Sequence, residues 1–330
     1  MLPGIGITCF AGSYAVLLAV ELISLRHETP FLRAAKWVWA IAGFFAHTAF
    51  LYYHVLMLVG SPLGSQQGWL LILAWLLVAA YLHLSANRPR NAFGPFILPI
   101  VLGIILAAAY WADASTIESS IARRGWASIH GASLLVMTLV ATFGFVTGLM
   151  FLEQSRRLKK KRPLIGIARL PSLEWLQRAN SRSRVIVMIL LAVGVLSGAE
   201  LNRLEYSESP DGIPFSDPIV LGSVALLIWL VVTFFLGRFH RPMRDGRRVA
   251  CQTMFCFLFL LLILGGGLLL QTRHWRAPAR TPDQDNDSQR DQDSDGQRDQ
   301  DTAATVTHRP TFRLSALFGD LPRVGEDHHD

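Results

Sequence analysis

Two histidines lie within stretches of sequence that are otherwise apolar. His47 is in the middle of the run over residues 36–59, and His130 is in the first turns of the run over residues 126–152. An imidazole is costly in hydrocarbon, so an ionisable residue at such a position indicates a functional site. Histidine is the commonest metal ligand and an axial ligand of haem iron, so metal ligation is the chemistry to consider for this pair.

Long apolar segments must position these histidines. The chain has 330 residues, of which 52% are hydrophobic and 17% charged, and its mean hydropathy is +0.36. Runs of about 20 apolar residues match the roughly 30 Å hydrocarbon core of a bilayer. The sequence therefore predicts an all-α polytopic membrane protein with about eight transmembrane helices. The eight apolar runs cover residues 3–25, 36–59, 68–84, 93–112, 126–152, 184–201, 218–237 and 249–270.

The distribution of charge predicts the orientation in the membrane. Twenty Lys and Arg fall in the odd-numbered connections or begin the run that follows (Lys36 and Arg184), and three fall in the even-numbered connections. By the positive-inside rule, this asymmetry predicts a multi-pass membrane protein with both termini extracytoplasmic. The membrane expected for it is a bacterial-type plasma (inner) membrane. The basic residues flank membrane helices, so they favour contact with the lipid bilayer and do not indicate nucleic-acid binding.

The longest internal connection, over residues 153–183, is strongly basic. It includes an expected start of a short amphipathic helix, with Ser172 as the N-cap. The position of this segment between membrane runs predicts a cytoplasmic loop.

The chain divides into a membrane part and an acidic tail. Residues 1–276 carry 25 Lys and Arg against 12 Asp and Glu, whereas residues 277–330 carry 6 against 12. The tail contains an Asp-rich eight-residue repeat, which cannot bury enough apolar surface to fold, so we expect it to be a disordered extracytoplasmic segment. Asp291, Asp293 and Asp295 match the opening of a calcium-binding loop, but the bidentate glutamate at the twelfth position is missing.

Depth in the bilayer limits which histidines could share a ligand. His47 is eleven residues beyond Lys36, so it lies roughly 16 Å into its run, near mid-bilayer. His54 is two turns further along nearly the same face, and His130 lies about one turn into its own run. Depth alone would therefore pair His130 with His54. His240 is expected at a cytoplasmic helix end.

Short motifs follow one another along residues 1–272. They are Gly43-Phe-Phe-Ala-His47-Thr, His130-Gly-Ala-Ser-Leu-Leu-Val-Met, Gly148-Leu-Met-Phe-Leu-Glu, Leu170-Pro-Ser-Leu-Glu, Ser197-Gly198-Ala199, Asp217-Pro218 and His240-Arg-Pro-Met-Arg-Asp-Gly246. In their order and spacing they resemble the cytochrome c assembly family, the CcsA/ResC-type haem-handling membrane proteins. The chain looks most similar to the HemX-like and YpjD-like members of that family.

The resemblance implies a haem-binding protein in cytochrome c maturation or haem trafficking. His47 and His130 fall where the family's intramembrane haem-ligand histidines lie, which implies haem b with one imidazole on each face of the iron. His54 and His240 are the alternative candidates for an axial ligand. The partners implied are haem, other cytochrome c maturation proteins and apocytochrome c.

One family signature is absent from this chain. The best-known haem lyases carry a Trp-rich WGxxWxWD motif before their penultimate helix, and here Pro214-Phe-Ser-Asp217-Pro218 stands in that place. Haem lyase activity is therefore not expected, and the resemblance favours an accessory protein over an enzyme. The HemX-like and YpjD-like members also lack this motif.

Two other functions stay open at the level of the sequence. The chain could be a membrane regulator or scaffold of tetrapyrrole synthesis that acts through the basic segment 153–183. It could also be a small-solute transporter whose histidines form a proton relay. The sequence has no P-loop, G-x-G-x-x-G, HExxH or nucleophile elbow, and it leaves open whether haem would be substrate, prosthetic group or signal.

Overall fold

The computed structural model describes residues 6–26, 29–54, 65–88, 92–112, 121–160, 170–208, 217–239 and 246–269, and every regular element in these ranges is an α-helix. The helices are α1 (Ile7–Ser24), α2 (Pro30–His54), α3 (Gln66–Asn87), α4 (Gly94–Tyr110), α5 (Ile121–Lys159), α6 (Leu173–Glu208), α7 (Pro218–Phe239) and α8 (Gly246–Leu269). Seven of these described helices are long and apolar enough to cross a membrane, and α4 is an apolar helix of 17 residues. The prediction of an all-α polytopic membrane protein is confirmed. The predicted tail lies outside the described residues.

Polar side chains begin several of these helices. The Ser65 hydroxyl accepts a hydrogen bond from the backbone N–H of Gly68 at 3.1 Å and so caps α3. The Ser172 hydroxyl lies 3.4 Å from the backbone nitrogen of Trp175 at the start of α6. Ser172 is therefore an N-cap, as predicted.

The segment over residues 153–183 differs from the prediction of a loop. α5 continues to Lys159, and α6 starts at Leu173 and runs without a break into the sixth apolar run. The predicted amphipathic helix is thus the first part of a membrane helix. Glu153 and Arg157 form an i,i+4 ion pair of 2.8 Å on the polar end of α5, which is a stabilising arrangement in a solvated helix. Hydropathy does not register such a polar extension.

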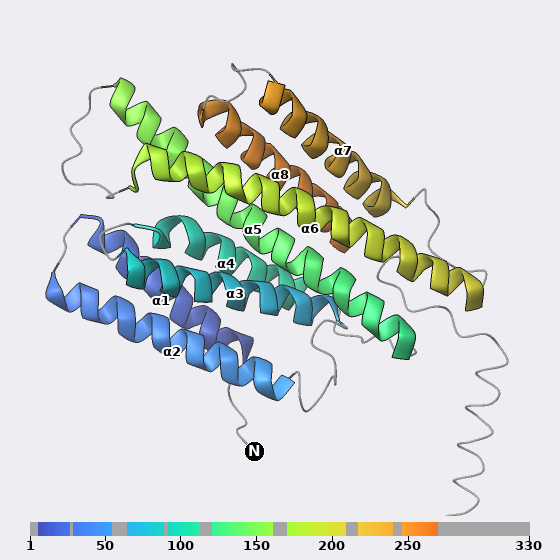
Figure 1. Cartoon of the computed structure of the whole chain (residues 1–330). Coiled ribbons are helices and arrows are strands. Elements are labelled where there is room, and N and C mark those ends of the chain that lie inside the picture. The colour runs from blue at the N-terminus through green and yellow to red at the C-terminus, as the bar shows by residue number, and fades with distance from the viewer. Residues whose placement is uncertain are drawn as a thin grey trace, which may run out of the picture. The chain divides into compact units, whose positions relative to one another are not determined.

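The described helices pack as two groups of four consecutive helices (Figure 1). In the first group, α1 packs against α2 and α4, and α3 packs against α4 and α2. In the second group, α5 packs most extensively against α6 and also against α8, while α7 contacts both α6 and α8. Among the substantial helix contacts, only the one between α3 and α5 joins the two groups.

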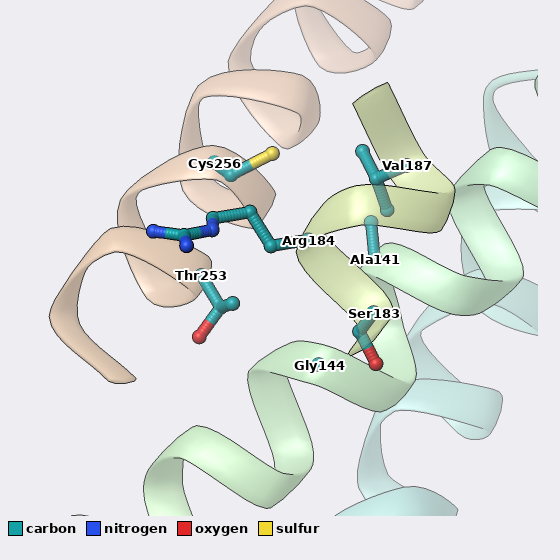
Figure 2. Close-up of a pocket in the computed structure, with 7 residues that line it drawn as sticks. All are labelled: Ala141, Gly144, Ser183, Arg184, Val187, Thr253 and Cys256. Carbon is teal, nitrogen blue, oxygen red and sulfur yellow. The ribbon is translucent and has the colours of Figure 1, made fainter. Parts of the chain in front are cut away.

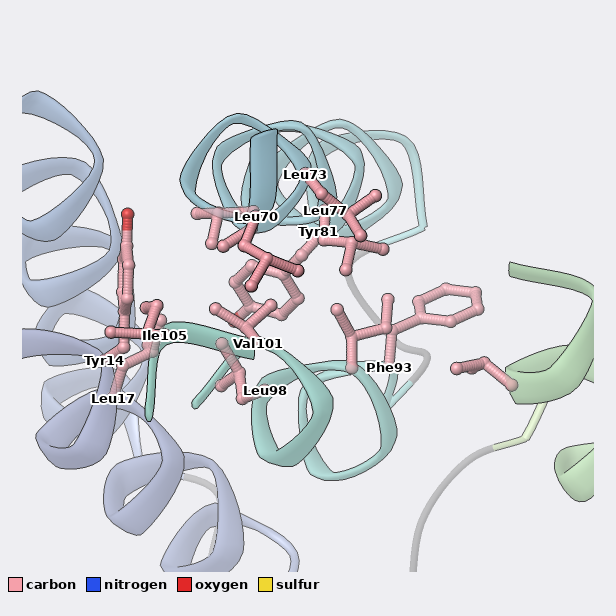
Figure 3. Close-up of a cluster of buried hydrophobic side chains, with 14 of the residues drawn as sticks. Tyr14, Leu17, Leu70, Leu73, Leu77, Tyr81, Phe93, Leu98, Val101 and Ile105 are labelled. Atoms are coloured by element: carbon pink, nitrogen blue, oxygen red, sulfur yellow. The ribbon is translucent and has the colours of Figure 1, made fainter. Parts of the chain in front are cut away.

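The first group is built around a core between α1, α3 and α4 (Figure 3). Tyr14 and Leu17 of α1, Leu77 of α3, and Val101 and Ile105 of α4 are each at most 2% exposed. Lipid tails are as apolar as these side chains, so helices in a membrane gain little from hiding them. The stability comes instead from close packing between the helices. This core fixes the position of α1, which contacts His47.

Candidate functional site

His47 of α2 is completely buried, with an exposed fraction of 0%. The ring of Phe10 in α1 stacks on the imidazole, with centroids 4.1 Å apart and planes at 3°. Nδ1 of His47 lies 3.2 Å from Tyr14 Oη, which is also 3.2 Å from the carbonyl oxygen of Gly43. A Cβ at Gly43 would lie 2.8 Å from the Tyr14 ring. Glycine at this position therefore lets α1 and α2 approach closely enough for the Tyr14–His47 contact.

The two ring nitrogens of His47 have different surroundings. When the single hydroxyl hydrogen of Tyr14 goes to the Gly43 carbonyl, Nδ1 of His47 donates to Tyr14 Oη, and Nε2 carries the lone pair of the neutral imidazole. The backbone carbonyl of Leu71 faces the ring, but Nε2 is buried without a partner in hydrogen-bond geometry. A metal binds this lone pair in the plane of the ring, a direction that the stacked Phe10 does not cover.

His130 of α5 is half-buried against α6. Its Nδ1 lies 2.8 Å from the carbonyl oxygen of Gly194. Because the carbonyl only accepts, Nδ1 carries the hydrogen of the neutral imidazole and Nε2 carries the lone pair. A Cβ at Gly198 would lie 2.9 Å from Cε1 and 3.0 Å from Nδ1 of His130. The imidazole thus lies directly on Gly198, and the small residue of the Ser197-Gly198-Ala199 motif makes room for it.

The structure places these two histidines against different helices. His47 contacts α1, and its helix packs against α1 and α3, whereas His130 contacts α6. No substantial contact joins α2 to α5. α5 begins at Ile121, five residues before the apolar run, so His130 lies about 13 Å from the helix start and about one turn into the candidate membrane span that starts at Gly125. The side chain of His54 and the whole of His240 lie outside the described residues.

The Asp217-Pro218 motif has a structural role in the described part of the chain. The Asp217 carboxylate accepts a hydrogen bond from the backbone N–H of Ile219 at 2.8 Å. Pro218 is the first residue of α7, the helical position at which proline is favoured. The two residues therefore form the N-terminal cap of a membrane helix.

Glu21 is a buried acidic residue in α1 that the sequence analysis missed. Its side chain accepts a hydrogen bond from Tyr81 Oη at 2.6 Å, and it forms an ion pair with Lys36 at 3.4 Å. A Cβ at Gly94 would lie 2.6 Å from the glutamate side chain. Glu21 therefore joins α1, α2, α3 and α4. The signal was available in the sequence, because Glu21 is the one acidic residue of the first apolar run.

A charged side chain also lies within the second helix group (Figure 2). Arg184 of α6 donates a hydrogen bond from Nη1 to Gln252 of α8, while its Nε has no partner. No carboxylate in the described part of the chain pairs with it. A cavity of about 10 Å³ lies beside it, lined in part by Ser183, Thr253 and Cys256, which is room for about one water molecule.

A buried amide joins three helices one turn before Arg184. Asn180 of α6 is 0% exposed, and its Oδ1 lies 3.0 Å from Thr147 Oγ1 of α5 and 3.2 Å from Thr253 Oγ1 of α8. Hydrogen bonds of this kind hold membrane helices together. Asn180 precedes the apolar run at 184–201, so hydropathy gives no sign of its place between membrane helices.

The donor chemistry at His47 fits haem iron, since a neutral imidazole presents a buried Nε2 without a partner. The cavities of about 10 Å³ and about 500 Å³ are lined by other residues than His47 and His130. Over the described ranges, no group of three or more His, Cys, Asp or Glu side chains could hold a metal ion by itself. Comparison of the chain with the models of known protein families and with the curated proteins finds no match.

Proposed function

We propose that this integral membrane protein binds haem through His47 and assists cytochrome c maturation or haem trafficking. The observation that carries the proposal is the buried Nε2 of His47, which has no hydrogen-bond partner. Leaving such a nitrogen unpaired costs about 1–3 kcal/mol, and a bound metal would remove that cost. The resemblance to the cytochrome c assembly family supports haem as the metal group.

The neighbours of His47 suit a ligand that must keep one orientation. Tyr14 holds Nδ1, and Phe10 stacks on the ring. A hydrogen bond to the second nitrogen of a ligating histidine fixes the tautomer and the ring direction. When bound, haem would supply a redox-active iron, or it would be the cargo that the protein carries. The protein itself supplies the imidazole, its orientation and an environment without water.

His130 is the proposed second ligand. Its Nδ1 is held by the Gly194 carbonyl, and a hydrogen bond of this kind orients a ligating imidazole. Its contact with α6, and not with α2, means that ligation by His130 has to be tested separately from ligation by His47. The asymmetry of basic residues supports a plasma-membrane protein with both termini extracytoplasmic.

The test is the absorption spectrum of protein purified from haem-replete cells. The wild-type protein should show a Soret band and one haem per chain by pyridine haemochrome assay. His47→Ala should lose at least nine-tenths of this haem, and His130→Ala should lose haem or convert it to a five-coordinate spectrum. The matched control is His83→Ala, because His83 is exposed and bonds to Asn87 in its own helix. A monodisperse wild-type protein without haem would refute the proposal, and so would full haem content in His47→Ala.

A further inference from the structure

A second cavity, of about 500 Å³, lies between the two helix groups. Its volume is in the range of ligand-binding pockets. α3 and α4 contribute Leu77 and Ile97, and α5 contributes Leu139 and Val146. Nearly all of the lining from these three helices is apolar.

The fourth wall of this cavity is one face of α6, and this wall carries positive charge. Arg178 and Arg182 both line the cavity, and so does Trp175 near the start of the same helix. Residues at i, i+3, i+4 and i+7 share one face of a helix, so the three side chains form a continuous strip. The guanidinium of Arg88, at the end of α3, lies 4.6 Å from the centre of the Trp175 ring. Two arginines therefore line an otherwise largely apolar cavity, and a third contacts the Trp175 ring of the same wall.

These positive charges are poorly compensated. Arg178 pairs with Glu174 at 2.9 Å, but both side chains are largely exposed, at 63% and 79%, and such pairs are weak. Arg182 has no ion-pair partner in the described ranges, and none of the residues that line the cavity is acidic. An apolar cavity with a poorly compensated cationic wall is complementary to an amphiphile whose head group is anionic.

We propose that this cavity is a binding site for one anionic phospholipid. Its acyl chains lie against the apolar side chains of α3, α4 and α5, and its phosphate lies between Arg178 and Arg182. A bilayer supplies such molecules at high local concentration, and each basic side chain near an anionic head group adds to the attraction. The site shares no residue with His47 or His130, so it does not depend on haem binding.

Tryptophan fluorescence in mixed micelles tests this site directly. The full chain is titrated with dibrominated phosphatidylglycerol or dibrominated phosphatidylcholine, and the same titrations are run on Trp175→Phe. The difference between the two proteins is the quenching of Trp175. The anionic lipid should quench Trp175 at a mole fraction lower by on the order of tenfold than the zwitterionic lipid. Equal quenching by the two lipids would overturn the proposal.

Charge variants provide the second measurement. The double variant Arg178→Gln/Arg182→Gln should lose the preference for phosphatidylglycerol and quench equally with both lipids. The matched control is Arg203→Gln, since Arg203 lies toward the other end of α6, away from the cavity lining, and pairs with Glu200 at 3.3 Å; it should keep the preference. Retention of the preference in the double variant would refute the site. If the double variant does not fold, the wild-type titrations with the two lipids test the site by themselves.

A competition with haem gives a further outcome. If equimolar haem displaces the brominated lipid, the cavity binds haem through its two carboxylates, and the proposal is overturned.

Discussion

The contact between His130 and Gly198 leads to a prediction about the free energy of unfolding. Gly198→Ala should lower it when His130 is present and raise it when His130 is replaced by alanine. In the wild-type protein, a methyl group at position 198 would lie 2.9 Å from Cε1 and 3.0 Å from Nδ1 of His130. Forcing a methyl into such a packed site costs about 1–3 kcal/mol. Moving the imidazole also weakens its 2.8 Å hydrogen bond to Gly194, which is worth about 0.5–1.5 kcal/mol. Alanine regains about 1 kcal/mol of helix propensity, so Gly198→Ala should destabilise by about 1–3 kcal/mol.

The outcome reverses once the imidazole is removed. The three atoms nearest to the added methyl all belong to His130, so in a His130→Ala background Gly198→Ala should stabilise by up to about 1 kcal/mol. The coupling energy of the double-mutant cycle is then about 2–4 kcal/mol. The assay is the free energy of unfolding from SDS titration in mixed micelles, followed by far-UV circular dichroism. The control is Gly103→Ala, where a methyl would meet nothing within 4 Å. Equal effects of Gly198→Ala in both backgrounds would refute the reasoning.

Two further substitutions test the contacts that hold the helices. Tyr81→Phe should lower the free energy of unfolding by about 1–3 kcal/mol, because it removes the hydroxyl that donates to buried Glu21. Tyr110→Phe is the control, since Tyr110 is 76% exposed, and a loss as large as that of Tyr81→Phe would contradict the explanation. Asp217→Ala should cost about 0.5–2 kcal/mol, because the backbone N–H of Ile219 loses its acceptor. Asp217→Asn should restore most of that stability, and equal losses in the two Asp217 variants would show that capping is not the cause. All four variants are compared by the same SDS titration.

The sequence was sufficient for the helices but not for their pairing. An apolar run long enough to span hydrocarbon has few alternatives to a helix, so each predicted run overlaps one described helix. The start of α6 was also predictable, because Ser172 is a typical N-cap. The lengths of α5 and α6 were not, because their polar ends give no hydropathy signal. Which helices pack together depends on shape and small residues across the interface, and these are not visible along a single chain.

At the candidate site, too, positions along the chain could be predicted from the sequence, whereas contacts between helices could not. The place of His47 within an apolar run was visible in the sequence, whereas the burial of its side chain, with an exposed fraction of 0%, comes from the fold. Its contacts with Phe10 and Tyr14 come from another helix and could not be read from spacing. Glu21 was visible as an acidic residue in an apolar run, yet its partner Tyr81 is sixty residues away in the sequence. Pairwise contacts of this kind require the fold.

The arrangement into two groups of consecutive helices has a consequence for how the chain is made. Nearly all of the contacts of α1–α4 are with one another, and those of α5–α8 are mainly with one another. Domains generally fold as units and in N-terminal order during synthesis. The first group can therefore finish packing in the membrane while the second is still being translated. An insertion error in α7 or α8 would then leave His47 and Glu21 correctly surrounded, whereas an error in α1 would remove the surroundings of both before α5 had left the ribosome.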